Sequence, residues 1–432
     1  MDRIAGRVAE ADISIMNATG RPGRFRIDHA SRVFTAACAC ALALALPIET
    51  RAQETPDPEA DARLLIGPVY LNPTFAIRDF GTDSNVFNDS VKPVSDFSMT
   101  LNPEVTGGMR LGPARVGFGT SLGLVLFQTY TNQNSVNRLL HGRIDLPLGR
   151  ISPFVGVEYL ATRARPGFEI DARAHRTEPT IRAGTEVRLT NQTSLSLALR
   201  RTEVTFAEGE QFLGRDLGDS LNRHSQTGSA IVRMAVTPLT TIVVLSEVER
   251  TRFDVSSMRD SNGLRVASGF EFQPDALFRG SAFLGLRRFQ ALSPEIPDYA
   301  GLAAAVSLVY TLRGTTKFEG RFDRDIAYSL EEATPYYLST GGSLTVTQQV
   351  VGPLDVTGTL AWQSLGYRAA SDSIIQDRVD RVKVFGVGTG YRLGESVRLG
   401  INVERTDRRS NILLFRNYNR SRIFGSLTYG VQ

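Results

Sequence analysis

Apolar and polar residues alternate along most of this chain, in stretches of about 8 to 12 positions that are each followed by a turn. In the stretch 181–189, for example, Ile181 and Val187 fall on one side, while Arg182, Glu186 and Arg188 fall on the other. A period of two is the geometry of an extended strand, in which successive side chains point to opposite faces. The chain therefore predicts a series of β-strands, each with one apolar and one polar face.

Short and long connections alternate between these stretches. Tight turns are predicted at residues 112–113, 148–149, 191–192, 238–239, 274–275, 313–314, 352–353 and 393–394. Longer polar connections are predicted at residues 79–95, 131–136, 162–175, 207–221, 254–259, 290–299, 326–335, 368–377 and 409–417. These eight turns and nine loops separate 18 strands. Each strand is long enough for the roughly 9 to 11 residues that cross a bilayer.

The alternation of short and long connections discriminates between all-β folds. A propeller places four strands in a repeat of about 40 to 50 residues, whereas a repeat of similar length here holds two. A sandwich imposes no strict alternation of short and long connections. A transmembrane barrel does, and it has an even number of strands, an apolar outer face and closure that pairs every backbone group. The predicted fold is an all-β, transmembrane antiparallel up-and-down β-barrel of about 18 strands, over residues 67–432.

The N-terminal region has the pattern of an export signal. A polar region that contains arginines precedes an apolar run at 33–48, and small residues follow at Thr50 and Ala52. A basic region, a short apolar core and a small-x-small exit are typical of a secretory signal peptide. We predict a signal peptide at 1–52, with cleavage after Ala52, and a flexible periplasmic lead-in at 53–66. A membrane anchor is the alternative, and Met16 is an alternative start.

The predicted location follows from the signal peptide and the barrel together. Both cysteines, Cys38 and Cys40, lie inside the apolar run, so the predicted mature chain has no disulfide. We predict the outer membrane of a Gram-negative-type cell, with both termini on the periplasmic side. The partners expected there are outer-membrane lipid, the barrel assembly machinery and small hydrophilic solutes. The net charge of +4 is too small to indicate nucleic-acid binding.

The start of the predicted barrel carries two short motifs. The residues from Gly67 to Pro73 form a G-x-x-x-x-x-P strand, and those from Asp83 to Phe87 read D-S-N-V-F. This opening resembles the first strand and loop of a family of outer-membrane β-barrel porins. The resemblance implies a porin-like barrel and assigns no site residues. Over the rest of the chain it extends only as the general barrel pattern.

The polar faces of the strands are charged enough to line a water-filled lumen, which a barrel with this number of strands can enclose. The candidate lumen-lining residues carry both signs, with arginine in excess: Arg182, Glu186, Arg188, Arg200, Arg265, Glu271, Arg279, Arg287, Lys317, Glu319, Arg321, Asp323, Arg398 and Glu404. Charges on the walls of a pore bias the passage of ions, so the excess predicts a weak preference for anions. Paired wall charges without a role in selectivity are the alternative.

Aromatic residues near the strand ends predict an interfacial girdle of the kind that membrane barrels carry. Its candidate members are Tyr130, Tyr159, Phe253, Phe289, Tyr310, Tyr367, Tyr391, Phe415 and Tyr429. The alternative is that aromatic residues are simply common in strands.

No motif for catalysis, a cofactor or a metal is present in the sequence. The predicted mature chain holds His141, His175 and His224, and Ser225 beside His224 would point to the opposite face of a strand. We therefore predict neither an enzyme nor a cofactor. The leading hypothesis is a porin-like channel for the passive passage of small hydrophilic solutes. The alternative is a non-conducting structural or export-accessory barrel that serves polysaccharide or protein secretion.

Overall fold

The computed structural model describes residues 62–430 apart from 274–275, 372, 374–377 and 395, so the predicted signal peptide 1–52 lies outside the described residues. A 19-stranded sheet consists of the short β1 (Leu64–Ile66) and 18 long strands. The long strands are β2 (Val69–Asp83), β3 (Asp96–Leu111), β4 (Ala114–Phe127), β5 (Ser135–Asp145), β6 (Ile151–Thr162), β7 (Arg176–Arg188), β8 (Thr193–Phe206), β11 (Arg223–Thr237), β12 (Thr240–Phe253), β13 (Ser261–Phe272), β14 (Phe278–Ala291), β15 (Tyr299–Leu312), β16 (Thr316–Tyr328), β17 (Tyr336–Val351), β18 (Leu354–Arg368), β19 (Val379–Leu393), β20 (Val397–Ser410) and β21 (Tyr418–Tyr429).

The remaining elements are short and lie in the connections. They are η1 (Thr131–Gln133), β9 (Gln211–Phe212), β10 (Arg215–Asp216), α2 (Leu217–Leu221), η2 (Ser257–Arg259) and η3 (Leu414–Arg416). Within the described residues, every helix falls short of what a membrane-spanning segment requires. The short β1 pairs with β2, so paired strand structure begins inside the predicted lead-in 53–66.

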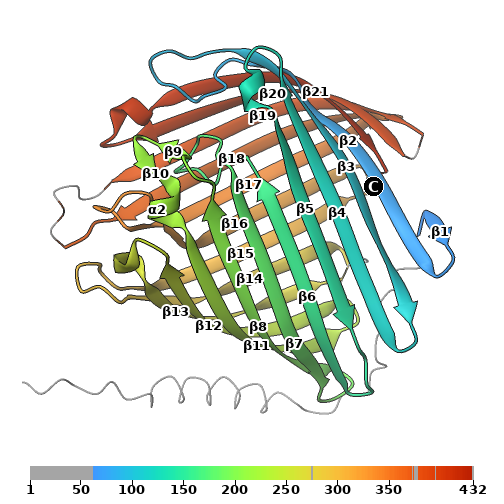
Figure 1. Ribbon diagram of the computed structural model, residues 1–432. Coiled ribbons are helices and arrows are strands. Elements are labelled where there is room, and N and C mark those ends of the chain that lie inside the picture. Colours follow the sequence, from blue (N-terminus) through green and yellow to red (C-terminus); the bar gives the residue numbers. More distant parts are fainter. Residues whose placement is uncertain (1–61, 274–275, 372, 374–377, 395, 431–432) are drawn as a thin grey trace, which may run out of the picture. The chain divides into compact units, whose positions relative to one another are not determined.

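The long strands form one closed barrel. Each pairs antiparallel with its neighbours in the chain, and β2 pairs with β21 to complete the ring. Figure 1 shows the long strands lying side by side in this order. Closure leaves no unpaired edge, which is what a wall in hydrocarbon requires because lipid cannot hydrogen-bond to the backbone. The predicted up-and-down barrel and its 18 strands are confirmed.

The two ends of the barrel differ in the length of their connections, as the alternation of turns and loops in the sequence predicts. One end, called here the turn end, carries short reversals such as 112–113, 238–239 and 352–353; the other, the loop end, carries the nine longer connections. Gly112 and Gly352 have φ values of 59° and 51°, a region that favours glycine. The predicted turn at 274–275 lies outside the described residues. The described turns coincide with their predicted positions.

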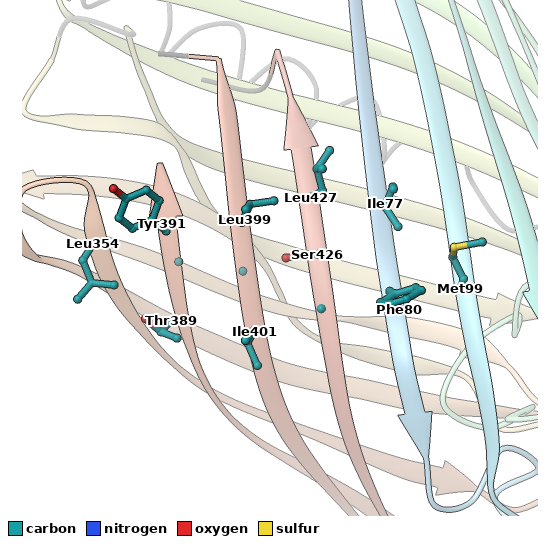
Figure 2. A pocket seen from close by; sticks show the side chains of 13 residues that line it. Ile77, Phe80, Met99, Leu354, Thr389, Tyr391, Leu399, Ile401, Ser426 and Leu427 are labelled. Carbon is teal, nitrogen blue, oxygen red and sulfur yellow. The ribbon is translucent and has the colours of Figure 1, made fainter. Parts of the chain in front are cut away.

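The outward face of the wall is apolar. Alternate side chains are exposed leucine, isoleucine, valine and aromatic residues, for example Leu197, Leu286 and Ile401. Figure 2 shows such side chains around a hollow of about 460 Å³ on β2, β3 and β18 to β21, with Ile77 and Leu427 among them. In a bilayer this surface would meet acyl chains, so its exposure here is consistent with a membrane barrel.

The inward face is identified by contacts between strands that are not neighbours. Arg265 on β13 forms an ion pair with Asp325 on β16, and Arg287 on β14 reaches Glu249 on β12. Such contacts can form only across the concave side of the wall. The polar faces of the predicted strands are therefore the inner faces.

The aromatic side chains divide between the two faces. On the outward face at the turn end, Phe270, Phe272, Phe278, Tyr310 and Phe318 form a row with ring centroids 5.0 to 6.3 Å apart. Tyr159, Tyr391 and Tyr429 are also exposed, as a girdle requires. The prediction is wrong for Phe253, Phe289 and Tyr367, which are buried among inward-facing side chains near the loop end. Position near a strand end does not specify which face a residue occupies.

Candidate functional site: the inner wall and the loops that cross it

The structure places all of the sequence-predicted lumen residues on the inward side of the wall. Arg182, Glu186 and Arg188 lie on β7, Arg200 on β8, Arg265 and Glu271 on β13, Arg279 and Arg287 on β14, Lys317, Glu319, Arg321 and Asp323 on β16, and Arg398 and Glu404 on β20. The register sets Arg182 opposite Arg200 and Arg265 opposite Arg287. The set does not form a single ring, because Arg188, Arg279 and Arg398 lie at the turn end and Arg287 lies toward the loop end.

Acidic side chains compensate some of these arginines. Arg287 Nη2 lies 2.5 Å from Glu249 Oε2, and Arg265 Nη1 lies 3.5 Å from Glu247 Oε2. Asp325 pairs with both arginines. Together these groups line a polar cavity of about 190 Å³ beside β12, β13 and β14. This part of the wall therefore carries paired rather than free charge.

A second group of arginines adjoins this cavity, and one of them, Arg200, also lines it. The register aligns Arg143 on β5 with Arg182 and Arg200 through Gly156 on β6. We call these three arginines the arginine row. The Arg143 guanidinium carbon lies 4.0 Å and that of Arg182 lies 5.7 Å from the centroid of the Phe154 ring, so both stack on it.

Only one member of the arginine row has a carboxylate partner among the described residues. Arg143 pairs with Asp145 at 2.6 Å, whereas Arg182 and Arg200 have no described carboxylate within 4.0 Å. Arg200 instead donates to Thr227 Oγ1 at 3.4 Å. The arginine row is therefore a local excess of positive charge on the inner face.

The loop between β6 and β7, residues 163–175, folds back onto the inner wall. Its Glu169 is 4% exposed and accepts hydrogen bonds from the Ser329 hydroxyl at 2.7 Å and the Leu330 N–H at 3.0 Å. Burial raises the pKa of the Glu169 carboxyl above its ordinary value. In the same loop, burial lowers the pKa of Arg165 to about 10, so this guanidinium remains charged at neutral pH.

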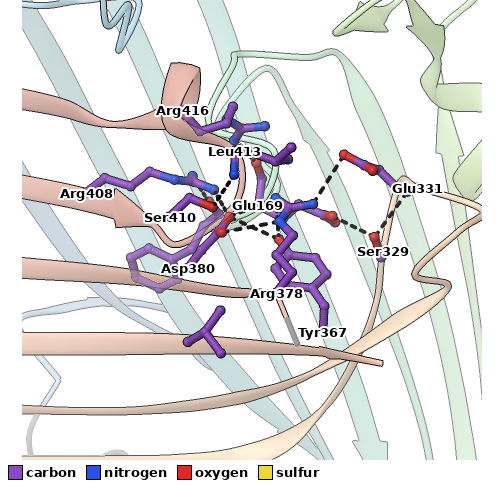
Figure 3. Close-up of polar contacts among 12 residues, drawn as sticks. Glu169, Ser329, Glu331, Tyr367, Arg378, Asp380, Arg408, Ser410, Leu413 and Arg416 are labelled. Atoms are coloured by element: carbon purple, nitrogen blue, oxygen red, sulfur yellow. Dashed lines mark hydrogen bonds and ion pairs between the residues drawn. The ribbon is translucent and has the colours of Figure 1, made fainter. Parts of the chain in front are cut away.

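An ion-pair network holds this loop against the far side of the barrel (Figure 3). Arg408 on β20 donates to Asp171 of the loop at 3.0 Å and to Asp380 on β19 at 2.7 Å. Arg416 of η3 reaches Asp171 at 3.3 Å, and Arg378 reaches Asp380 at 2.8 Å. Arg408 and Asp380 are fully buried. The network joins segments that are more than 200 residues apart in the chain.

Apolar contacts join the loops to one another. Ile170, Ala174, Leu217, Leu221 and Leu330 form one buried cluster that connects loops 163–175, 207–222 and 329–335. Arg259 of η2 donates to the Ser220 and Leu330 carbonyls at 2.6 and 3.0 Å, which adds a fourth loop. We call these four packed loops the loop cap. The loop cap gives the loop end a core of its own.

Sequence reasoning missed the loop cap and its network. Loop 163–175 was predicted only as a long polar connection, although it alternates Phe168, Glu169, Ile170 and Asp171. Ile170 between these two acids is a signal of packing, because a solvated loop gains nothing from a bulky apolar residue; Ile170 is buried, whereas Phe168 is 46% exposed. The partners Arg378 and Arg408 could not have been found, since their role depends on contacts across the barrel.

The chemistry available on the inner face is electrostatic. Among the described residues, no group of three His, Cys, Asp or Glu side chains could hold a metal ion. His175 Nδ1 lies 2.6 Å from Glu210 Oε1, His224 lies 3.7 Å from Asp254, and Ser225 hydrogen-bonds with Thr251. The inner wall offers fixed guanidinium and carboxylate charges to whatever enters it.

A closed antiparallel barrel with an apolar outer face and a charged inner face defines a class, the porin-like barrels of the outer membrane. The chain belongs to the family described as Putative beta-barrel porin 2, which matches residues 66–429. It is therefore a porin-like outer-membrane barrel, as its sequence predicts. No curated protein matches the chain.

Solved structures give distant likenesses. OpdK of Pseudomonas aeruginosa, solved with vanillate, is 9% identical, with a TM-score of 0.46 over 83% of this chain and 98% of that chain. Pseudomonas aeruginosa OccK2 (OpdF), in complex with glucuronate, is 10% identical, with a TM-score of 0.46 over 83% and 97%. The FrpB iron transporter from Neisseria meningitidis is 10% identical, with a TM-score of 0.40 over 78% and 62%.

Proposed function

We propose that the barrel conducts small hydrophilic solutes passively and prefers anions. The observation that carries this proposal is the arginine row on the inner face, where Arg182 and Arg200 have no carboxylate partner among the described residues. Guanidinium groups stay charged at any working pH, and they hold carboxylates or phosphates in a fork geometry. No step of covalent chemistry is required of the wall, so we propose a channel and not an enzyme.

We propose that the loop end faces the cell exterior and that both chain termini face the periplasm. Short periplasmic turns and longer external loops are the usual arrangement of such barrels. The described chain enters at the turn end through β1 and leaves it after β21, which supports this orientation. A single cysteine placed in loop 411–417 should then react with an impermeant maleimide on intact cells, whereas one at Gly112 should not.

The loop cap favours a second candidate function. Because several loops pack on one another and across the inner wall, the loop end could be closed, as a non-conducting structural or export-accessory barrel would require. Conductance separates the two candidates. The channel predicts steady ion current through the purified barrel in a planar bilayer, and the alternative predicts none.

The test of anion preference is the reversal potential in a salt gradient. Changing Arg182, Arg188 and Arg200 together to Glu turns three positive charges into three negative ones, so the sign of the reversal potential should change. The effect should be largest at low salt, where screening is weakest. Arg201→Glu is the matched control, because Arg201 neighbours Arg200 but faces outward. An unchanged reversal potential in the triple variant would show that these arginines do not line the conducting path.

A further inference from the structure

The charged side chains on the outward face gather at one level of the barrel. They all lie within six residues of the loop end of their strands: Arg138, Arg201, Glu203, Arg250, Arg252, Arg288, Arg324, Arg368, Arg381, Lys383, Arg405, Asp407 and Arg409. We call this set the arginine belt; it holds eleven cations and two carboxylates. Nearer the turn end, the outward positions of the described strands carry no Asp, Glu, Lys or Arg.

The protein itself neutralises little of the arginine belt. In the described part of the chain, ion pairs with carboxylates reach Arg252, at 3.7 Å from Asp260, and Arg409, at 3.2 Å from Asp407. Arg201, Arg250 and Arg288 are exposed, with no described carboxylate in range. An excess of positive charge at the edge of an apolar band is unfavourable unless anions from outside the protein approach it.

One sector of the arginine belt has the features of a built site. The register places Arg201, Gln226, Arg250 and Asn262 in one row across β8, β11, β12 and β13, all facing outward. Neighbouring strands lie about 4.8 Å apart, so Arg201 and Arg250, two strands apart, are separated by about 10 Å at the backbone. This row presents two guanidinium groups with amide groups between and beside them.

An apolar hollow lies directly below this row. It has a volume of about 460 Å³, and Ile181, Leu199, Gly228 and Val248 line it together with Arg201 and Arg250. Gly228 faces outward and leaves the floor of the hollow open; a Cβ there would lie 3.6 Å from Leu199 Cδ2, an ordinary contact. An acyl chain could therefore lie in the hollow while its headgroup reaches the cations above.

We propose that Arg201, Gln226, Arg250 and the hollow below them bind a phosphorylated lipid of the outer leaflet. Guanidinium forks match phosphate oxygens in geometry and charge, and the apolar lining matches the acyl chains. The assignment to the outer leaflet rests on the proposed orientation, with the loop end outward; the binding itself does not depend on conduction. A second copy of the chain in the same orientation fits poorly, since it would face the arginine belt with cations of its own.

The test is lipid binding by the purified, folded barrel, measured by native mass spectrometry. Diphosphoryl lipid A is the probe, and phosphatidylcholine and inorganic phosphate are the comparisons. We expect lipid A to bind at least tenfold more tightly than phosphatidylcholine, and the double variant R201Q/R250Q to lose about tenfold. R321Q, which removes an inward-facing arginine from β16, is the matched control and should bind as the wild type does.

A third variant, G228L, fills the hollow without a change of charge and should also weaken lipid A binding. Equal affinity for phosphatidylcholine, or unchanged affinity in R201Q/R250Q, would overturn the proposal. Displacement of lipid A by inorganic phosphate alone would assign a free-anion site instead, and dimers in place of lipid adducts would assign a protein contact. Heat-dependent gel migration verifies that each variant is folded. The conductance of R201Q/R250Q should be unchanged, so failure here and failure of the proposed channel are distinguishable.

Discussion

Replacing Arg408 with methionine should release loop 163–175 from the inner wall. Arg408 is fully buried and donates to Asp171 and Asp380 at 3.0 and 2.7 Å. Removing one partner of a buried ion pair typically costs about 3 to 5 kcal/mol, because an uncompensated charge stays buried. Here Asp380 keeps Arg378 at 2.8 Å and Asp171 keeps Arg416 at 3.3 Å. The expected loss in the free energy of loop docking is therefore the lower limit of this range, about 3 kcal/mol.

That loss corresponds to a change of about 100-fold in the ratio of docked to released loop, since 1.4 kcal/mol is a factor of ten. The assay is tryptic cleavage of the folded barrel after Arg163 and Arg173, followed by mass spectrometry. Cleavage of a transiently released segment tracks its population when release is fast. Cleavage in R408M should therefore accelerate by about two orders of magnitude, and single-channel current should rise if the loop narrows the path.

The matched control is R409M, one residue further along β20. Arg409 faces outward, is half-exposed and pairs only with Asp407 among the described carboxylates, so its replacement should leave the cleavage rate unchanged. Equal rates in R408M and wild type, with normal gel migration, would refute the reasoning that the buried pair holds the loop. If R408M fails to assemble, R416M removes the other partner of Asp171 from a loop and provides the same test.

Three further outcomes are expected. Leu197→Arg places a charge on the lipid face and should cost about 2 to 4 kcal/mol of folding free energy. Ser196→Arg, on the inner face, should cost much less. Urea-dependent folding into vesicles measures the folding free energy of both variants. Burial raises the pKa of Glu169, so the docking of loop 163–175 should be strongest below the ordinary carboxyl pKa and should weaken as the pH rises through the raised pKa. Single-channel recordings between about pH 4 and pH 8 measure this dependence, and Glu169→Gln should abolish it. Asp83→Ala removes the bidentate partner of Arg420, 2.8 to 2.9 Å from its Nε, at the closing strand pair, and should lower the unfolding temperature measured by gel migration.

The wall of the barrel could be predicted because its determinants are local. A period of two fixes which side chains share a face, and a turn fixes which strands are neighbours. The sequence alone therefore assigned Arg182 to the inner face and Ile181 to the outer face, which is where the structure has them. The proposed role of the inward residues in selectivity stays a prediction.

The loops could not be predicted because their determinants are non-local. Glu169 meets Leu330 and Asp171 meets Arg408, and no period in the sequence relates these positions. The same reason explains the aromatic residues that were misplaced. Phe289 packs on Tyr336, with ring centroids 4.7 Å apart, inside a cluster that exists only once the strand ends and loops have come together.

The near balance of acids and bases in the whole sequence conceals two separate populations of arginine. Arg200 and Arg201 are consecutive, yet the first faces the inner wall beside Arg182 and the second faces outward beside Gln226. Several inward arginines meet carboxylates, as Arg287 meets Glu249, while outward arginines are confined to one level near the loop end. One strand can carry both inward and outward arginines because its two faces meet different solvents. The inner face meets water, and the outer face meets lipid with its headgroups. Total charge therefore describes neither surface, and only the separation by face gives each arginine a physical role.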